Sequence, residues 1–215
     1  MFKFSEIEAV FFDFDNTIAR VDVLDEIIQR FSINDDWQKL EEAWARGEIG
    51  SRLCLEQQLS GVRITQEKLV EYLKTVEIDP QFKPLLKRLR NGGLQPVITS
   101  DNVSFIIREI LGHQGISDIP IFSNELLVHG DRWALSFPYF KADCPKCGNC
   151  KKSHLPASGV RKGLTVYVGD GRSDICPAEY SDIVFAKATL LKHLNSIKKE
   201  CIPFEDLGSI AQYFK

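Results

Sequence analysis

The sequence contains no apolar run close to the roughly 18 residues that a membrane-spanning helix requires. Its first residues, MFKFSE, lack the basic segment and apolar core of a signal peptide. Neither sign of charge dominates, since 27 basic and 30 acidic residues give a formal net charge of −3. Nucleic acid and anionic membrane surfaces therefore have no electrostatic reason to bind. We expect a cytoplasmic globular protein with neither a nucleic-acid nor a membrane partner.

A disulfide framework is also missing. The chain has only six cysteines among 215 residues, and with no signal peptide visible we do not expect it to enter an oxidising compartment. Three of them, Cys144, Cys147 and Cys150, lie within seven residues, and His154 follows four residues later. This CxxC-type spacing suits zinc, so these four residues are a candidate structural zinc site. Free or redox-sensitive thiols beside Lys151 are the alternative.

Strand-like and helical segments alternate along the chain, which is typical of a parallel sheet with helices on both faces. The apolar pattern predicts strands at 10–14, 96–99, 119–122, 132–137, 164–168 and 183–185. Residues 20–79 have helical spacing and no good strand. The fold class is therefore α/β, with a Rossmann-like core formed by residues 1–19 and 80–215. Residues 20–79 are predicted to form a small helical cap inserted after the first strand.

Three of the predicted strands end in polar residues. In open α/β sheets, ligands bind beyond the carboxyl ends of the strands, so these residues should meet in one crevice. Several carboxylates in one crevice repel each other, and Mg²⁺ with oxygen ligands relieves that repulsion. A hydroxyl, the N–H groups of a helix start and a nearby lysine could bind phosphate. The polar residues are Asp13 and Asp15, then Ser100, Asp101 and Asn102, then Asp170 and Asp174, with Lys151 or Lys152 as the lysine.

These residues resemble the motifs of the haloacid dehalogenase (HAD) superfamily of phosphatases. The segment DFDNT at 13–17 is similar to the DxDxT nucleophile motif, and GDGRSD at 169–174 is similar to the GDGxxD motif. Ser100 fits the second motif, with Thr99 as the neighbouring alternative, and Lys151 fits the third. The resemblance covers nearly the whole chain, with the motifs in the family's order.

The resemblance implies Mg²⁺ as cofactor and an aspartyl-phosphate mechanism. It makes Asp13 the nucleophile and Asp15 the acid and base, and Asp15 would also lend its backbone carbonyl to the metal. Thr17 would hold the loop. The remaining roles are phosphate or substrate binding for Ser100, Asp101, Asn102 and Lys151, and metal binding for Asp13, Asp15, Asp170 and Asp174.

The helical insertion resembles the cap of the phosphoserine-phosphatase-like branch, where an acidic residue at the position of Asp22 reads the substrate. A helix N-cap is the alternative role for Asp22. Trp37 and Trp44 lie seven residues apart, a spacing that favours core packing over an aromatic substrate cage. The substrate signals disagree. Residues 100–102 and 169–177 are similar to phosphoethanolamine/phosphocholine phosphatases, a group that includes a pyridoxal-phosphate phosphatase. Residues 147–151 and 181–187 are similar to the methionine-salvage 2-hydroxy-3-keto-5-methylthiopentenyl-1-phosphate phosphatase.

The sequence thus predicts a Mg²⁺-dependent phosphomonoesterase acting on a small phosphorylated metabolite through an aspartyl-phosphate. The alternatives are a phosphotransferase or mutase of the same superfamily and a non-catalytic sensor of a phosphometabolite. The complete motif set argues against the sensor. The oligomeric state and the identity of the metabolite are not predicted.

Overall fold

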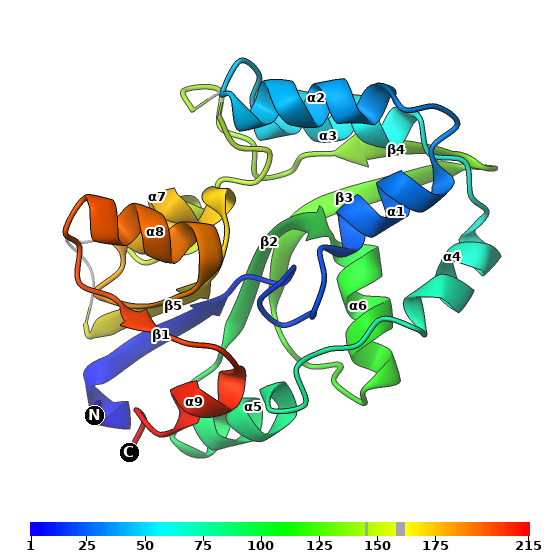
Figure 1. Ribbon diagram of the computed structural model, residues 1–215. Helices are drawn as coiled ribbons and strands as arrows, with labels where there is room; N and C mark the ends of the chain where they lie inside the picture. The colour runs from blue at the N-terminus through cyan, green and yellow to red at the C-terminus, as the bar shows by residue number, and fades with distance from the viewer. Residues whose placement is uncertain (145, 158–161) are drawn as a thin grey trace.

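The computed structural model describes residues 1–144, 146–157 and 162–215. A seven-stranded sheet in the order β4-β3-β2-β1-β5-β6-β7 forms its centre (Figure 1). All neighbouring strands are parallel except β3 and β4, which form an antiparallel hairpin. The mostly parallel α/β sheet predicted from the sequence is confirmed. The strands are β1 (Ile7–Phe12), β2 (Val97–Val103), β3 (Ile121–His129), β4 (Arg132–Ser136), β5 (Leu164–Gly169), β6 (Ile183–Ala186) and β7 (Ile202–Pro203).

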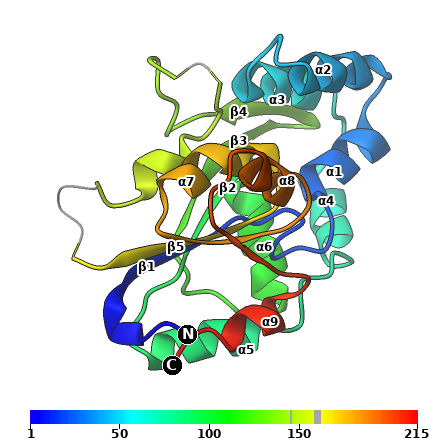
Figure 2. The ribbon, with the colours of Figure 1, turned by 60° about the vertical axis from the view of Figure 1, so that its left-hand side comes forward.

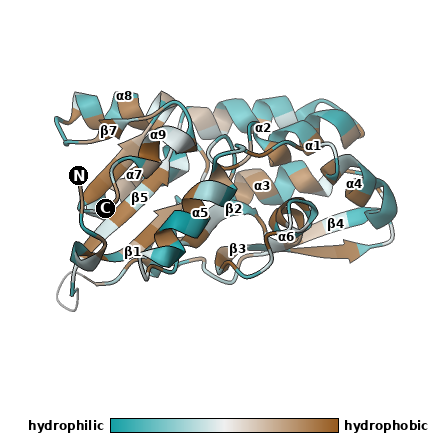
Figure 3. Cartoon of the chain, turned by 90° about the horizontal axis from the view of Figure 1, so that it is seen from below, coloured by the Kyte–Doolittle hydropathy of each residue, from teal (hydrophilic) through white to brown (hydrophobic). Residues whose placement is uncertain are grey.

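Helices cover both faces of the sheet because successive side chains of each strand point to opposite faces. Phe12 and Val168 pack in the larger core, with α5, α6 and α9. Phe11 and Tyr167, their neighbours in sequence, pack in a second core with α7 and α8. Figure 3 shows the strands largely in hydrophobic colours, whereas α5 turns a hydrophilic side outward. The helices are α5 (Phe82–Asn91), α6 (Ser104–His113), α7 (Ile175–Tyr180), α8 (Ala188–Ser196) and α9 (Leu207–Ala211).

Four helices lie between β1 and α5 in the chain. Two of them, α2 (Asp36–Ala45) and α3 (Ser51–Ser60), lie on the opposite side of the molecule from α5 and α9, next to β4 (Figures 1 and 2). The other two, α1 (Val23–Phe31) and α4 (Gln66–Leu73), connect this layer to the core. The β3–β4 hairpin helps to hold the layer, since Trp133 Nε1 donates a hydrogen bond of 3.2 Å to Ile64 O. None of the described helices is long and apolar enough to cross a membrane.

Two strand ends differ from the sequence prediction. Strand β1 ends at Phe12, so Asp13 already lies in the turn beyond the sheet. Asn16 takes a positive φ of 51° in that turn, a conformation that asparagine adopts more readily than most residues. Strand β2 runs on to Val103 instead of ending at Thr99, and its pairing with β3 shifts register between these two residues. The shift places Ser100, Asp101 and Asn102 on an irregular strand tip at the carboxyl edge of the sheet.

Candidate active site

A cavity of about 170 Å³ lies between the carboxyl edge of the sheet and helices α1–α3. It is smaller than the roughly 300–1,000 Å³ of pockets for drug-sized ligands. Residues from both layers line it. From the core come Asp13, Asp15, Asn16, Ser100, Asp101, Asn102, Lys151, Asp170, Gly171, Arg172 and Ser173, and from the helical layer come Asp22, Leu24, Asp25, Glu41, Trp44, Ser51, Cys54, Leu55 and Gln58.

Asp13 stands at the centre of the core side of the cavity, directly after β1. Its backbone N–H donates to Val168 O at 2.9 Å, so the neighbouring strand β5 fixes the turn. The residue is 5% exposed. Burial, together with Asp174 and Asp170, raises the pKa of Asp13 well above its usual value, while Lys151 opposes this rise. The site therefore contains more negative charge than its own lysine neutralises.

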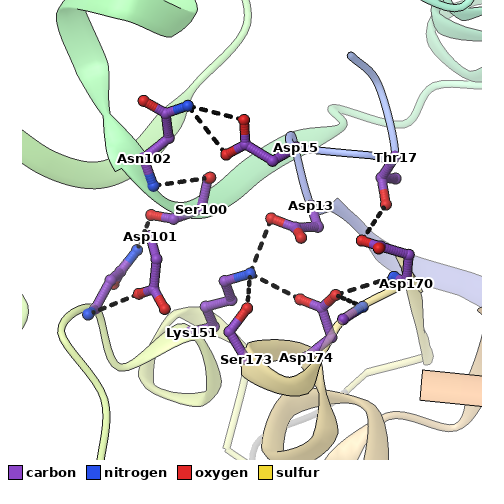
Figure 4. A network of polar contacts seen from close by, with 12 residues as sticks. Asp13, Asp15, Thr17, Ser100, Asp101, Asn102, Lys151, Asp170, Ser173 and Asp174 are labelled. Atoms are coloured by element: carbon purple, nitrogen blue, oxygen red, sulfur yellow. Dashed lines mark hydrogen bonds and ion pairs between the residues drawn. The ribbon is translucent and has the colours of Figure 1, made fainter. Parts of the chain in front are cut away.

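Lys151 is the buried cation of the site, and it comes from the short 3₁₀ helix η2 (Lys151–His154). Its Nζ donates three hydrogen bonds, to Asp13 Oδ1 at 2.8 Å, to Asp174 Oδ1 at 2.7 Å and to Ser173 Oγ at 2.9 Å (Figure 4). Burial alone would lower the pKa of Lys151, but these carboxylates raise it well above its usual value. Lys151 therefore stays protonated and uses all three donors of its ammonium group.

Asp174 is held from several sides. Its Oδ2 accepts the backbone N–H groups of Asp170 and Gly171 at 3.0 and 2.9 Å, and its Oδ1 accepts the hydroxyl of Tyr167 at 2.7 Å. Burial would raise the pKa of Asp174, but Lys151 outweighs it and lowers the pKa. A side chain at Gly169 would place its Cβ 2.5 Å from Asp174 Oδ2, so this close approach requires glycine.

One group of carboxylates in the described part of the chain could hold a metal ion. Ligand atoms of Asp13, Asp170 and Asp174 lie within 4.8 Å of one another. Burial and Asp174 raise the pKa of Asp170 to about 6, and Thr17 Oγ1 donates to its Oδ1 at 3.3 Å. Oxygen ligands and excess negative charge fit a hard divalent cation such as Mg²⁺.

The carboxylate of Asp15 points away from this group. Its two oxygens accept hydrogen bonds from Asn102 Nδ2 at 2.9 and 3.0 Å (Figure 4). Its Oδ1 also accepts the backbone N–H of Val23, the first residue of α1, at 2.9 Å. Burial and the nearby Asp22 raise the pKa of Asp15 well above its usual value. Asp15 is therefore fixed in orientation and disposed to hold a proton.

The tip of β2 separates the two candidate hydroxyls of the second motif. Ser100 lines the cavity, and its Oγ accepts the backbone N–H of Asn102 at 3.1 Å, which leaves its own proton free for a ligand. Thr99 Oγ1 is buried and finds no hydrogen-bond partner among the described residues. Asp101 Oδ1 accepts the backbone N–H of Asn149 at 3.0 Å. The geometry thus favours Ser100 as the ligand-binding hydroxyl, and it gives Asp101 and Asn102 partners within the protein.

Three carboxylates face the cavity from the helical layer. Asp22 is the N-cap of α1, since its Oδ1 accepts the backbone N–H of Asp25 at 3.0 Å, and it also lines the cavity. The two roles weighed for Asp22 are therefore compatible. Burial raises the pKa of Asp25 to about 7, and Asp22 and Glu41 add to the rise. The sequence analysis did not single out Asp25 or Glu41. Asp25 lies on α1 and Glu41 on α2, and nothing in the sequence indicates that these two side chains line the same cavity.

Trp44 and Arg172 close the rim of the cavity. Arg172 Nη1 donates to the carbonyl oxygens of Trp44, at 3.2 Å, and of Ala45. Its guanidinium lies 5.6 Å from the centre of the Trp44 ring. Trp44 Nε1 donates to Ser51 Oγ at 3.0 Å. Trp44 thus lines the cavity, contrary to the core position that its spacing favoured, whereas Trp37 packs against the core.

The cysteine segment is arranged differently from the candidate metal centre. Within the described ranges, neither its thiols nor His154 belong to a group of three or more ligand atoms within 4.8 Å. Cys144, Cys147 and Cys150 are free thiols. His154 Nε2 lies 2.8 Å from Asn149 Oδ1. The zinc site stays a prediction, and the structure engages His154 in a hydrogen bond within the protein.

Known proteins resemble this chain over nearly its whole length. A family described as "Putative Phosphatase" matches residues 8–199. Pdp3-interacting factor 1 of Schizosaccharomyces pombe is 30% identical over 221 residues, which cover 96% of this chain and 93% of that protein. The 2-hydroxy-3-keto-5-methylthiopentenyl-1-phosphate phosphatase of Brevibacillus brevis is 25% identical over 185 residues, which cover 84% of this chain and 83% of that enzyme.

A solved structure shares the fold. The structure described as "Phospho-Aspartyl Intermediate Analogue of Phosphoserine phosphatase" superposes with a TM-score of 0.72 at 22% identity. The match covers 98% of this chain and 99% of that one. At this level of identity the likeness shows the α/β fold alone.

Proposed function

The chain belongs to the "Putative Phosphatase" family and is a phosphatase of the HAD superfamily, and from this premise we propose a mechanism and a substrate class. We propose that it is a Mg²⁺-dependent phosphomonoesterase that forms an aspartyl-phosphate on Asp13. The observation that carries the proposal is the buried group of Asp13, Asp170 and Asp174 around the Lys151 ammonium.

Asp13 is the proposed nucleophile because it is the carboxylate of this group that follows β1 directly and faces the open cavity. One of its oxygens forms a bond to phosphorus while the bond from phosphorus to the substrate's ester oxygen breaks. Lys151 holds Asp13 Oδ1 at 2.8 Å, which fixes the direction of attack. Ser100 would donate its hydroxyl proton to a phosphoryl oxygen.

Asp15 is the proposed acid and base. Its raised pKa allows it to arrive protonated and to give that proton to the leaving alcohol. The same carboxylate then takes a proton from the water that attacks the aspartyl-phosphate, so inorganic phosphate leaves and Asp13 is regenerated. The hydrogen bonds from Asn102 hold the carboxylate through both steps.

Asp13, Asp170 and Asp174 would hold Mg²⁺ together with the backbone carbonyl of Asp15. The bound ion would neutralise charge on the phosphoryl oxygens and orient them for in-line transfer. Thr17 keeps Asp170 in place through its hydroxyl. The raised pKa of Asp170 supports this assignment, because the ionised form of a buried carboxylate beside Asp174 is stabilised by a cation.

Residues 20–79 act as the cap in this proposal, and the cap determines the substrate class. Its end of the cavity presents Asp22, Asp25 and Glu41, and the arginine at the rim, Arg172, is bound to helix carbonyls. A carboxylate on the substrate would be repelled there, whereas an amine or ammonium group would be attracted. We propose a small phosphomonoester with a cationic group opposite the phosphate.

A panel of phosphomonoesters tests the proposal. We expect Mg²⁺-dependent release of inorganic phosphate, faster from phosphoethanolamine and phosphocholine than from phosphoserine, pyridoxal phosphate or a neutral sugar phosphate. EDTA and Asp13→Asn should abolish release, and the exposed Asp131→Asn should not change it. Absence of turnover on every ester in the presence of Mg²⁺ would refute the hydrolase mechanism, and a preference for carboxylated esters would refute the substrate class.

A further inference from the structure

Asn149 is a buried asparagine, 1% exposed, which lies between Cys147 and Cys150 and two residues before Lys151. Its backbone N–H donates to Asp101 Oδ1 at 3.0 Å. Its side-chain Nδ2 donates to two carbonyl oxygens, of Ser100 at 2.8 Å and of Phe122 at 2.9 Å. Its own carbonyl oxygen accepts the N–H of Lys151 at 2.9 Å. One residue thus bonds to both segments that supply the proposed phosphate-binding groups.

The orientation of the Asn149 amide determines which nitrogen of His154 carries the proton. Because Nδ2 faces two carbonyl oxygens, Oδ1 must be the atom that faces His154 Nε2 at 2.8 Å. Oδ1 can only accept, so His154 carries its proton on Nε2 and donates it. Burial, with a contribution from Lys141, lowers the pKa of His154 to about 4. The imidazole is therefore neutral at the pH of the cell.

Aromatic contacts fix the plane of the His154 ring. It stacks on Phe122 with ring centres 4.5 Å apart and an angle of 8° between the planes. It meets Tyr139 edge to face, at 4.6 Å and 90°. Tyr139 is tied to the same segment, since its carbonyl oxygen accepts the N–H of Cys150 at 3.2 Å. The Nε2–H group of His154 is therefore fixed both in its direction and in its distance from Asn149 Oδ1.

The connection matters because Ser100 and Lys151 belong to segments about fifty residues apart in the chain. Ser100 lies on the irregular tip of β2, where regular pairing with β3 is interrupted. Lys151 lies on a single 3₁₀ turn. Neither segment has a regular element to fix it relative to the other, so the Asn149 amide provides the direct bond between the Ser100 backbone and the residues beside Lys151.

We propose that Asn149 and His154 are positioning residues, which hold the Ser100 hydroxyl and the Lys151 ammonium at the spacing that the transferring phosphoryl group requires. This rests on the proposed function, and it adds to it a role for two residues that touch neither substrate nor metal. A displacement of about 1 Å in such groups can lower a rate about 100-fold.

Two substitutions of His154 separate the hydrogen bond from the ring packing. His154→Phe keeps an aromatic ring between Phe122 and Tyr139 but removes the donor. His154→Gln supplies an amide donor near the position of Nε2 but removes the ring. We expect kcat to fall about 10- to 100-fold in His154→Phe and to recover at least partly in His154→Gln. Thermal stability should follow the opposite order, and His113→Phe, the same change at an exposed site, should alter neither.

Inhibition by inorganic phosphate provides a second measurement, and the inhibition constant should rise in His154→Phe and in Asn149→Ala. The preference between cationic and neutral esters should stay as in the wild type, since the cap is not touched. Wild-type kcat and phosphate inhibition in folded His154→Phe would overturn the inference, as would a His154→Gln variant as impaired as His154→Phe. Failure of the wild type itself to hydrolyse any ester would instead refute the proposed function.

Discussion

The pH dependence of stability provides a sharp test of the acidic cap, because Asp25 titrates near neutrality. Burial, Asp22 and Glu41 raise its pKa from 3.8 to about 7. Between these two pH values the folded state keeps a proton that the unfolded state releases. The free energy of unfolding therefore falls as the pH rises through this window, and the whole loss is present above pH 7.

The magnitude follows from the shift. One pH unit corresponds to about 1.4 kcal/mol, so a rise from 3.8 to about 7 corresponds to at most about 4 kcal/mol. Asp25 is only partly buried, and solvent screens its charge. We therefore expect about 2 kcal/mol. Asp25→Asn removes the titration, so it should stabilise the protein by about 2 kcal/mol at pH 8 and change little at pH 4.5.

Denaturant unfolding of the wild type and Asp25→Asn at pH 4.5, 6 and 8 measures this difference. Asp131→Asn, the same change at an exposed residue, is the control and should show no pH-dependent gain. In parallel, Asp25→Asn should raise KM for phosphoethanolamine above pH 7, where the wild-type carboxylate is ionised. A stability difference that is the same at all three pH values would refute the assignment of the raised pKa to Asp25.

Three further changes test other parts of the site. Lys151→Met leaves Asp13 and Asp174 without their cation and should destabilise the protein by about 3–5 kcal/mol at pH 7.5 in denaturant unfolding. Protonation of the carboxylates removes their mutual repulsion, so this loss of stability should shrink towards pH 5. A loss that is the same at both pH values would contradict the charge argument. Tyr167→Phe removes the hydroxyl that donates to Asp174 and should cost about 1.5–3 kcal/mol by the same assay, whereas no loss would show that the bond is dispensable. Arg172→Ala frees the carbonyl end of α2 and should raise KM for the best ester more than it lowers kcat; an effect on kcat alone would contradict a role in closing the cavity.

The fold could be predicted because its signals are local. The alternation of strand-like and helical segments predicted the parallel sheet. The lack of strand-like segments in residues 20–79 predicted the helical insertion after the first strand. Strand ends were less predictable. Ser100, Asp101 and Asn102 look like a turn in sequence, yet β2 continues through them because β3 pairs beside it with a shifted register. Pairing between distant strands has no signature in either strand alone.

For the candidate site, the sequence predicted which residue types lie at the strand ends, but it did not predict how their side chains are oriented. The sequence put Asp13, Asp170 and Asp174 at strand ends, and the tertiary structure brings their carboxylates within 4.8 Å. It gave no indication that Asp15 turns towards Asn102, or that Ser173 and Tyr167 complete the bonds around Lys151 and Asp174. These contacts join residues from separate elements, so they depend on how the elements pack.

By itself, the sequence predicted a phosphatase, because it places the residue types of that chemistry at particular predicted strand ends. Only the tertiary structure decided that the helical layer adds further carboxylates to the cavity, and which residues bond to Ser100 and Lys151. Asp25, Glu41 and Trp44 face the cavity through the packing of α1 and α2, and Asn149 joins β2 to Lys151 through hydrogen bonds across distant segments. The charge of the cavity and the orientation of its side chains depend on this packing, and no single segment of the chain determines how the elements pack.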